Sequence, residues 1–283
     1  PPDFFREPPE NLVFRGGGPA GVVYAGVYKA LEAENKLENL KRVAGTSAGS
    51  IMATLIGVGL NADRVEQILG VNIAEFLDES DRGRAFLDQI GERDITSALP
   101  HFKQTLITIA MQAAKAGVKK EWKGMLGGLF GFGDGLASSW LAGMREHVEG
   151  FPVGICTGNA LEAKIESWIF EGTEVEHCTF KELRELIAGQ PDRNFKHIHL
   201  YTTQVKIENG EDKVAVVRLT SEDLGQGEQW WDNVVISSAV RASVSIPVAF
   251  EPAVLKVKME GIAEPVPVEE YGKFLDGGML MNT

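Results

Sequence analysis

The chain has 283 residues, of which 44% are hydrophobic and 24% charged, a balance typical of a folded globular protein. Its formal net charge of −12, without a basic stripe interleaved with aromatics, argues against nucleic acid as a partner. The N-terminus has no signal-peptide pattern, and the apolar run at residues 51–60 is about half the ~20 residues that a membrane-spanning helix needs. We therefore expect a soluble protein without a transmembrane segment or a cleavable signal. Cys156 and Cys178 are expected to be reduced packing residues.

Two strand–turn–helix units open the chain. Residues 11–15 form a short apolar run that leads into a glycine cluster, and residues 22–35 carry apolar side chains at helical spacing. Residues 41–44 are then predicted to form a strand, 45–49 a turn, and 50–59 an apolar helix that ends at glycine. Two such units in succession predict a parallel sheet covered by helices.

The rest of the chain is predicted to hold further helices and strands around a glycine-rich loop at residues 124–135. Helices are expected at residues 61–69, 81–93, 101–116, 160–170, 179–187 and 231–242. Thr179 is expected to cap the helix at residues 179–187. Strands are expected at residues 196–205, 213–219 and 272–275. Because no repeat or low-complexity linker divides the sequence, we expect residues 1–283 to form a single domain.

The motif at residues 45–49 (GTSAG) lies between the second predicted strand and the helix that follows it. A serine at such a bend is held on a strained turn with its hydroxyl exposed, and the helix N-terminus favours developing negative charge. Ser47 is therefore a candidate nucleophile. The alternative is a glycine-rich turn in which Ser47 only caps the helix.

A glycine cluster at residues 16–21 (GGGPAG) follows the first predicted strand. Consecutive glycines let several backbone N–H groups point at one anion, because no Cβ obstructs the approach. Beside a serine nucleophile, such a cluster would form an oxyanion hole. The candidate donors are the N–H groups of Gly16, Gly17, Gly18 and Ala48.

The same cluster also matches the GxGxxG fingerprint of dinucleotide-binding proteins, flanked by a strand and a helix. In that interpretation Lys41 or Arg42 could serve a 2′-phosphate. It also needs an acidic residue at the end of the second strand, about 20 positions on. That strand ends instead in Gly45-Thr46-Ser47.

The histidines are poorly placed to complete a catalytic triad. The order serine, acid, histidine of α/β-hydrolases is not followed, because the last histidine, His199, precedes the last acidic residue. His197 and His199 alternate in a predicted strand and so share one face, which favours packing over metal binding. Surface positions are expected for His101, His147 and His177.

A carboxylate is the remaining candidate base. Asp276-Gly277-Gly278 follows the last predicted strand, at the C-terminal strand edge where active sites of open α/β sheets collect. A free aspartate, with a pKa of about 3.9, is a weak base, so this role requires partial desolvation and a direct hydrogen bond to Ser47. The alternative is a plain Asp-Gly turn, of which residues 134–135 are a second example.

Three motifs, in this order and on these elements, resemble those of the patatin-like phospholipase family: residues 16–21, 45–49 and 276–278. Three further segments are similar to the family: residues 23–32 (VYAGVYKALE), 179–183 (TFKEL) and 242–252 (ASVSIPVAFEP). The resemblance covers residues 11–282, nearly the whole chain. The glycine cluster, the AGTSAGS segment and the SIP segment are similar to those of bacterial members, including secreted phospholipase toxins.

The resemblance implies a three-layer α/β/α fold with a mainly parallel central sheet, and a Ser-Asp dyad without histidine. Ser47 would be the nucleophile and Asp276 the general base. The glycines that belong to the family motifs would be Gly21, Gly45, Gly49, Gly277 and Gly278. The implied reaction is transfer of an acyl group from a glycerophospholipid to Ser47, followed by hydrolysis of the acyl-enzyme. No metal or other cofactor is implied for catalysis.

Two features depart from the family pattern. Ala20 stands where members usually carry a basic residue before the last glycine of the first motif, which would weaken activity or alter substrate choice. The chain also stops at Thr283, where members generally continue, so a C-terminal segment for membrane docking or regulation is expected to be missing. Some secreted bacterial relatives require a host cofactor, so a protein activator is a further expected partner.

A phospholipase must reach a lipid surface, and residues 115–132 are suited to that task. Lysines spaced four apart are followed by aromatic and aliphatic side chains, and this combination favours interfacial binding. We expect this segment to be a lid or a membrane contact. The expected contact residues are Lys119, Lys120, Trp122, Lys123 and Phe130. The alternative is a solvated helix face beside a core loop.

The sequence thus favours a lipid acyl hydrolase of phospholipase A or lysophospholipase type. It is expected to be cytoplasmic or a secreted effector, and to act peripherally at membranes. Three alternatives stay open: a neutral-lipid or general carboxylesterase with the same dyad, a catalytically silent patatin-like interaction protein, and a nucleotide-binding Rossmann protein. A substrate panel would identify the carboxylesterase, and an unreactive Ser47 would identify the silent interaction protein. Saturable NAD(P) binding would identify the Rossmann protein.

Overall fold

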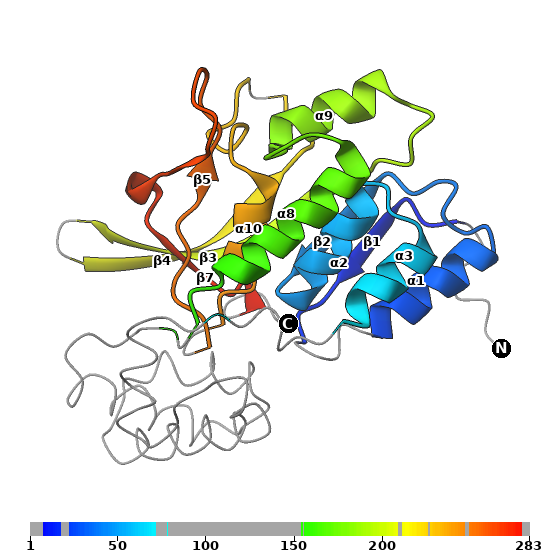
Figure 1. The fold of residues 1–283 in the computed structure, drawn as a ribbon, viewed down its shortest axis with the longest axis horizontal. Helices are drawn as coiled ribbons and strands as arrows, with labels where there is room; N and C mark the ends of the chain where they lie inside the picture. Colours follow the sequence, from blue (N-terminus) through cyan, green and yellow to red (C-terminus); the bar gives the residue numbers. More distant parts are fainter. Residues whose placement is uncertain are drawn as a thin grey trace, which may run out of the picture.

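The computed structural model of the chain describes residues 8–17, 23–71, 78, 154, 156–208, 211–225, 227–246 and 249–278. The helices expected at residues 81–93 and 101–116 and the loop expected at 124–135 lie outside these residues. Within the described part, a central sheet is packed against helices (Figure 1).

The described residues form one five-stranded sheet of order β1-β2-β3-β4, in which β7 also pairs with β3. The strands are β1 (Asn11–Phe14), β2 (Arg42–Thr46), β3 (His197–Glu208), β4 (Glu211–Thr220) and β7 (Lys273–Leu275). β1, β2 and β3 run parallel, whereas β4 and β7 are antiparallel to β3. The predicted α/β class with a mainly parallel sheet is confirmed. A second, two-stranded sheet pairs β5 (Lys256–Val257) with β6 (Val266–Pro267).

Both faces of the central strand β3 are covered. Successive side chains of a strand point to opposite faces, so Ile198 and Thr202 lie on one side and His199 and Thr203 on the other. None of these four residues is more than 8% exposed. Helices α2 and α10 pack against the sheet, and α8 lies across both of them (Figure 1).

The described helices are α1 (Val23–Ala33), α2 (Ala48–Gly57), α3 (Ala62–Leu69), α8 (Asn159–Thr173), α9 (Phe180–Gly189), α10 (Ile236–Ser243) and the short 3₁₀ helix η4 (Glu269–Tyr271). Thr179 caps α9 as predicted, because its hydroxyl accepts the N–H of Glu182 while the Glu182 carboxylate accepts the N–H of Thr179. Cys156 and Cys178 form no disulfide and are fully buried, in agreement with a packing role.

The prediction of a helix over residues 231–242 is wrong at its start, since the helix begins at Ile236. Asp232 accepts the backbone N–H of Gln229 at 3.1 Å and pairs with Arg184. Trp231 donates its indole N–H to the carbonyl O of Thr220 at 3.0 Å. These side-chain bonds hold residues 231–234 in a turn, which local periodicity does not reveal.

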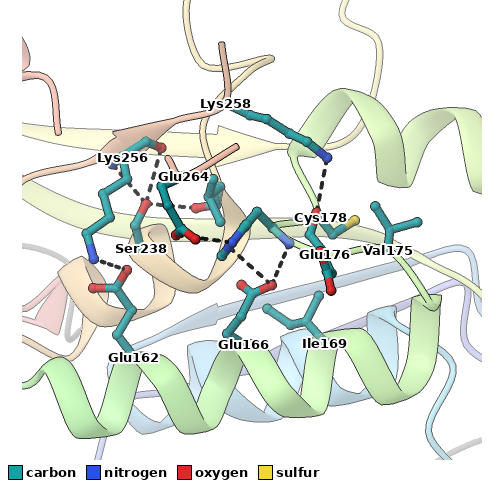
Figure 2. A network of polar contacts seen from close by, with 12 residues as sticks. Glu162, Glu166, Ile169, Val175, Glu176, Cys178, Ser238, Lys256, Lys258 and Glu264 are labelled. Atoms are coloured by element: carbon teal, nitrogen blue, oxygen red, sulfur yellow. Dashed lines mark hydrogen bonds and ion pairs between the residues drawn. The ribbon is translucent and has the colours of Figure 1, made fainter. Parts of the chain in front are cut away.

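Polar contacts fasten the segment that carries β5 onto α8 and the loop after it (Figure 2). Lys256 forms an ion pair with Glu162 at 2.8 Å, and Lys258 donates to the carbonyl O of Glu176 at 3.0 Å. The hydroxyl of Ser238, in α10, accepts the backbone N–H of Lys256 at 3.1 Å. This network anchors the first turn of α10, the helix whose other end enters the candidate site.

Candidate active site

The sheet brings the ends of β2 and β7 together beside β3. β4 pairs with β3 from His199 onward and occupies one edge of it, so β2 and β7 share the other edge. β2 runs parallel to β3 and ends with Thr46 opposite Tyr201, whereas β7 runs the opposite way and ends with Leu275 opposite Thr203. The next residue of each strand, Ser47 and Asp276, therefore enters the gap between the two strand ends.

The direction of β7 differs from the arrangement that the sequence suggested. Asp276 does follow the last strand, but that strand is antiparallel to β3 rather than a further parallel strand. Its carboxyl end therefore faces the carboxyl end of β2 head-on along one edge of β3. This meeting of two strand ends, rather than a shared row of parallel ends, places the carboxylate near the serine.

Ser47 lies on a strained turn between β2 and α2. Its backbone dihedrals are φ 52° and ψ −130°, a combination that is rare for a residue with a side chain and costs on the order of 1–3 kcal/mol. Ser47 precedes the first helical residue, yet its side chain makes no capping hydrogen bond within the described residues. The strain and the missing cap favour a nucleophile over a serine that only caps the helix.

Two motif glycines make this turn sterically feasible. A Cβ on Gly45 would collide with the carbonyl group of Gly49, and a Cβ on Gly49 would collide with the carbonyl group of Phe14. The first turn of α2 is therefore pressed against both its own strand and the end of β1. This close packing explains why the pattern has glycine at both ends of the motif.

Asp276 is held by backbone and hydroxyl contacts from two neighbouring elements. Its N–H donates to the carbonyl O of Ser245 at 2.9 Å, and its carbonyl O accepts the hydroxyl of Thr203 at 3.0 Å. The N–H of Gly278 donates to Oδ1 of the Asp276 carboxylate at 2.7 Å. The loop is thus fixed on both sides, and the carboxylate sits at 0% exposure.

Burial raises the pKa of Asp276 from 3.8 to about 6. Removal of a carboxylate from water disfavours its charged form, and the nearby Ser47 hydroxyl and the hydrogen bond from the Gly278 N–H oppose this effect only in part. Within the described residues Asp276 forms no ion pair, so no cation returns the pKa to its usual range. The group is therefore a stronger base than a free aspartate.

The side chains of Ser47 and Asp276 interact, but not in a regular hydrogen bond. The Ser47 hydroxyl lowers the pKa of the carboxyl group, because it favours the charged form. Even so, the buried Oδ2 atom of Asp276 has no hydrogen-bond partner of regular geometry in the described part of the chain. Loose contacts of this kind are common in unliganded active sites and tighten when substrate binds.

The described part of the glycine cluster lies at the end of β1. Gly49 packs against the carbonyl groups of Phe14 and Arg15, so Gly16 and Gly17 directly follow the point where β1 meets the turn that bears Ser47. Ala48 begins α2, and amides of a first helical turn have no intrahelical partner. The two glycine motifs therefore meet at the turn that bears Ser47.

Some predicted residues lie outside the described residues. They are Gly18, Ala20 and Gly21 of the glycine cluster, the expected membrane-contact residues Lys119, Lys120, Trp122, Lys123 and Phe130, and the histidines His101 and His147.

Gly277 is required by a close approach of three backbone segments. A Cβ at this position would collide with the carbonyl O of Tyr201 and with Oγ1 of Thr46. The Asp276 loop can therefore pack against the ends of β2 and β3 only because residue 277 has no side chain. This contact is specific to the site and distinguishes it from an ordinary Asp-Gly turn.

His197 and His199 lie toward the opposite end of the sheet. They stand opposite Arg42 and Ala44 in the register, four and two residues before the partner of Thr46. Burial lowers the pKa of both histidines, and Nε2 of His199 lies 3.3 Å from the carboxylate of Glu222. The interpretation as packing residues agrees with this position.

The dinucleotide interpretation finds no support at β2. Lys41 and Arg42 lie at the amino end of this strand, whereas nucleotides bind at the carboxyl ends of parallel strands. Both cations are also paired, Lys41 with Glu10 at 2.6 Å and Arg42 with Glu222 at 2.5 Å. Neither side chain is positioned to serve a phosphate beside the glycine cluster.

Sequence reasoning missed the hydroxyl groups that hold the two catalytic candidates in place. Thr202 and Thr203, in the middle of β3, donate to the carbonyl groups of Leu275 and Asp276. Ser243, at the end of α10, accepts the backbone N–H of Ser47 at 3.0 Å. Ser243 lies in a segment that resembles the family, but no local pattern indicated what it contacts.

Among the described residues, no group of three or more His, Cys, Asp or Glu side chains is arranged to hold a metal ion. No helix among the described elements is both long enough and apolar enough to cross a membrane.

Comparison with known proteins places the chain in a family. It is similar to VipD from Legionella pneumophila, with a TM-score of 0.45 and 19% identity over 96% of this chain and 46% of VipD. It is also similar to full-length ExoU from the type III secretion system of Pseudomonas aeruginosa, solved in complex with full-length SpcU. That match has a TM-score of 0.40 and 17% identity over 87% of this chain and 39% of ExoU.

Among curated proteins, the uncharacterized protein YqhO of Bacillus subtilis (strain 168) is 44% identical over 57 residues, which are 20% of this chain and 19% of YqhO. The chain spans less than half the length of each of these three proteins. The family model described as patatin-like phospholipase matches residues 12–283, almost the entire chain. The resemblance seen in the sequence is thereby confirmed, and the chain belongs to the patatin-like phospholipase family.

Proposed function

We propose that this chain is a lipid acyl hydrolase of phospholipase A or lysophospholipase type, with Ser47 as nucleophile and Asp276 as general base. Membership of the patatin-like phospholipase family supports lipid hydrolysis as the general activity. The observation that carries the dyad is the meeting of a strained serine with a buried carboxylate whose pKa is raised to about 6. A base of this pKa is largely ionised at neutral pH and still accepts a proton more readily than a free aspartate.

In the first step, Oγ of Ser47 attacks the carbonyl carbon of the ester and its proton passes to the carboxylate of Asp276. The tetrahedral oxyanion is stabilised by N–H groups of Ala48, Gly16, Gly17 and Gly18, a contribution of about 2.7–4 kcal/mol per donor. The intermediate collapses, the bond to the leaving alkoxide breaks, and that alkoxide takes the proton from Asp276. An acyl-Ser47 ester and the free alcohol, a lysophospholipid in the simplest case, result.

In the second step, the carboxylate of Asp276 removes a proton from water, and the water oxygen attacks the acyl carbon. Collapse of the second tetrahedral intermediate breaks the bond to Oγ of Ser47, which recovers the proton from Asp276. The fatty acid leaves and the starting state is restored. These steps use only side chains and backbone groups of this chain, so we propose that the reaction needs no cofactor.

The decisive experiment combines a fluorophosphonate probe with vesicle hydrolysis, using the unmodified chain, Ser47→Ala, Asp276→Asn and Glu222→Gln. The probe reports activation of the nucleophile without the right lipid. We expect labelling at Ser47, located by mass spectrometry, with labelling and hydrolysis lost in Ser47→Ala. Asp276→Asn should label far more slowly, and Glu222→Gln should label as the unmodified chain does.

Labelling of another residue, or lipid hydrolysis that survives in Ser47→Ala, would refute the dyad. A chain that is inert with phospholipid vesicles and active on short-chain or neutral esters would point to the carboxylesterase alternative. Addition of host cell extract to an inert chain tests the protein activator, which would raise both labelling and hydrolysis. Without any labelling under these conditions, the chain would be a catalytically silent member of the family.

We also propose that the chain acts peripherally at membranes through residues 115–132, either inside a cell or as a secreted effector. The lysines of this segment would attract anionic lipid and its aromatic side chains would enter the interface. Charge reversal at Lys119, Lys120 and Lys123 should weaken binding to anionic vesicles, measured by co-sedimentation, and leave binding to neutral vesicles unchanged. Unchanged binding to anionic vesicles would exclude this contact.

A further inference from the structure

Ser243 contacts all three segments that form the candidate site. It is the last residue of α10 and is fully buried. Its Oγ accepts the backbone N–H of Ser47 at 3.0 Å and donates to the carbonyl O of Tyr201 at 2.6 Å. Its own carbonyl O accepts the N–H of Gly277 at 3.1 Å. A single residue thus connects the turn that bears Ser47, the central strand β3 and the loop that bears Asp276.

The hydroxyl of Ser243 has a role that only a combined donor and acceptor can fill. Because its proton is directed at the carbonyl O of Tyr201, a lone pair is left for the N–H of Ser47. Ser47 lies beyond the last ladder pair of β2, so its N–H has no strand partner. Loss of the hydroxyl would leave this N–H unpaired in the interior, at the very residue whose backbone is strained.

The same segment also fixes the base. The carbonyl O of Ser245 accepts the N–H of Asp276 at 2.9 Å, next to the bond between Ser243 and Gly277. The carbonyl groups of Ser245 and Ser243 therefore hold the backbones of Asp276 and Gly277, and the Ser243 hydroxyl holds the backbone of Ser47. Replacement of Ser243 by alanine removes the second link and leaves the carbonyl links in place.

We propose that Ser243 is a positioning residue, whose hydroxyl holds the Ser47 backbone in the strained conformation that directs Oγ toward the Asp276 carboxylate. This inference rests on the proposed function for its catalytic meaning, but its structural content can be measured without any substrate. A displacement of the nucleophile by about 1 Å is enough to slow catalysis about 10²-fold. The expected defect therefore lies in the chemical step rather than in lipid binding.

Ser238 provides a matched control on the same helix. It is equally buried, donates its hydroxyl proton to the carbonyl O of Val235 at 2.8 Å and accepts the N–H of Lys256 at 3.1 Å (Figure 2). It lies five residues before Ser243, and its hydroxyl makes no hydrogen bond to a site residue within the described part of the chain. Ser238→Ala therefore removes the same kind of buried hydroxyl from α10 without affecting Ser47.

The experiment compares the full chain with Ser243→Ala, Ser243→Cys and Ser238→Ala. We expect Ser243→Ala to slow fluorophosphonate labelling of Ser47 and kcat about 10- to 100-fold with little change in KM. The cysteine variant keeps a weaker donor and acceptor at this position, so its rate should fall between those of Ser243→Ala and the unmodified chain. Ser238→Ala should lose a similar amount of thermal stability and label at the rate of the unmodified chain. Equal slowing by both alanine variants, in proportion to their loss of stability, would overturn the inference.

An NMR titration separates failure of this inference from failure of the proposed function. In Ser243→Ala the Ser47 amide signal should shift and lose protection against hydrogen exchange. The pKa of Asp276, followed at its carboxyl carbon, should rise above the value in the unmodified chain, because the Ser47 hydroxyl no longer favours the charged form. If both signals are unchanged, the inference is wrong even in an active enzyme. If both change in a chain that hydrolyses no lipid, the positioning role holds and the proposed function fails.

Discussion

The two ends of the central sheet each hold an acidic side chain, in opposite electrostatic surroundings. At the carboxyl end of β2, Asp276 is fully buried without an ion pair among the described residues, and its pKa is raised to about 6. At the amino end, Glu222 pairs with Arg42 at 2.5 Å and lies 3.3 Å from His199. The hydrogen bond and charge of Arg42 lower the pKa of Glu222.

The difference shows how one fold makes a carboxylate either reactive or structural. A carboxylate that is paired with a cation gains stability as an anion and becomes a poorer base. A carboxylate that is buried without a cation takes a proton more readily than a free carboxylate, as a base for a serine must. The histidines, which a conventional triad would use, lie near the structural carboxylate and not near Ser47.

The largest expected effect is on catalytic activity, which should depend on Asp276 and not on Glu222. Asp276→Asn should reduce kcat/KM for lipid hydrolysis about 10²- to 10⁴-fold, the usual contribution of general acid–base catalysis. Glu222→Gln makes the same chemical change at the other end and should leave kcat/KM within about twofold, a surface-type effect. Steady-state assays on vesicles measure both. Similar losses in the two variants would show that the ends do not differ in role.

Replacement of Asp276 should raise the stability of the protein at neutral pH, although it lowers activity. Asp276 has a folded-state pKa above its unfolded value, so its burial costs stability as pH rises from about 4 to about 6, and this cost persists above pH 6. The shift corresponds to about 3 kcal/mol at 1.36 kcal/mol per pKa unit. Asp276→Asn should therefore raise the free energy of unfolding at pH 7–8 by up to that amount, with no gain below pH 4. Urea denaturation across this pH range measures the change in the free energy of unfolding. If the substitution lowered stability at pH 7–8, Asp276 would have a purely structural role.

Gly277 allows a test of the close packing that only the reactive end requires. Gly277→Ala should destabilise the protein by about 1–3 kcal/mol and impair catalysis, because the new methyl group collides with Tyr201 and Thr46. The control, Gly26→Ala in α1, meets open space and should stabilise by up to about 1 kcal/mol. Thermal unfolding of both variants gives the comparison. A harmless alanine at position 277 would show that the loop does not pack as described.

The smallest effect is expected at the paired carboxylate. Because the pKa of Glu222 is lowered in the folded state, its stabilising contribution is present above its unfolded pKa and is lost as pH falls through the folded value. Glu222→Gln should therefore cost about 1 kcal/mol or less at pH 7, the usual contribution of a partly exposed ion pair, and nothing at pH 3. Denaturation at the two pH values measures this difference. A loss that is the same at both would contradict the assigned ion pair.

Much of this arrangement could be predicted from local sequence. The glycine motif around Ser47 lies between a strand and a helix because its small residues permit the close contacts with Gly49 and Phe14. Asp276 could be identified as the remaining base because the histidines are unsuitably ordered. The Thr179 cap could likewise be predicted from the sequence, since a capping box involves residues only three positions apart.

The features that escaped prediction depend on pairings between distant residues. β7 has only three residues, and its antiparallel direction is set by pairing with residues about 70 positions earlier in β3. The contact of Ser243 with Ser47 joins residues 196 positions apart, and a serine at a helix end carries no signal for it. The turn at residues 231–234 depends on the contact of Trp231 with Thr220 and of Asp232 with Arg184. Local periodicity contains none of this information.

The pH dependence of Ser47 labelling by a fluorophosphonate tests the central claim most directly, because it reports the ionisation of the base without substrate binding or product release. If Asp276 is the base, the labelling rate should rise with pH to a plateau with a midpoint of about 6, and Asp276→Asn should abolish this rise. His199→Gln should leave the midpoint unchanged. A midpoint that persists in Asp276→Asn, or that disappears in His199→Gln, would contradict the assignment of Asp276 as the base.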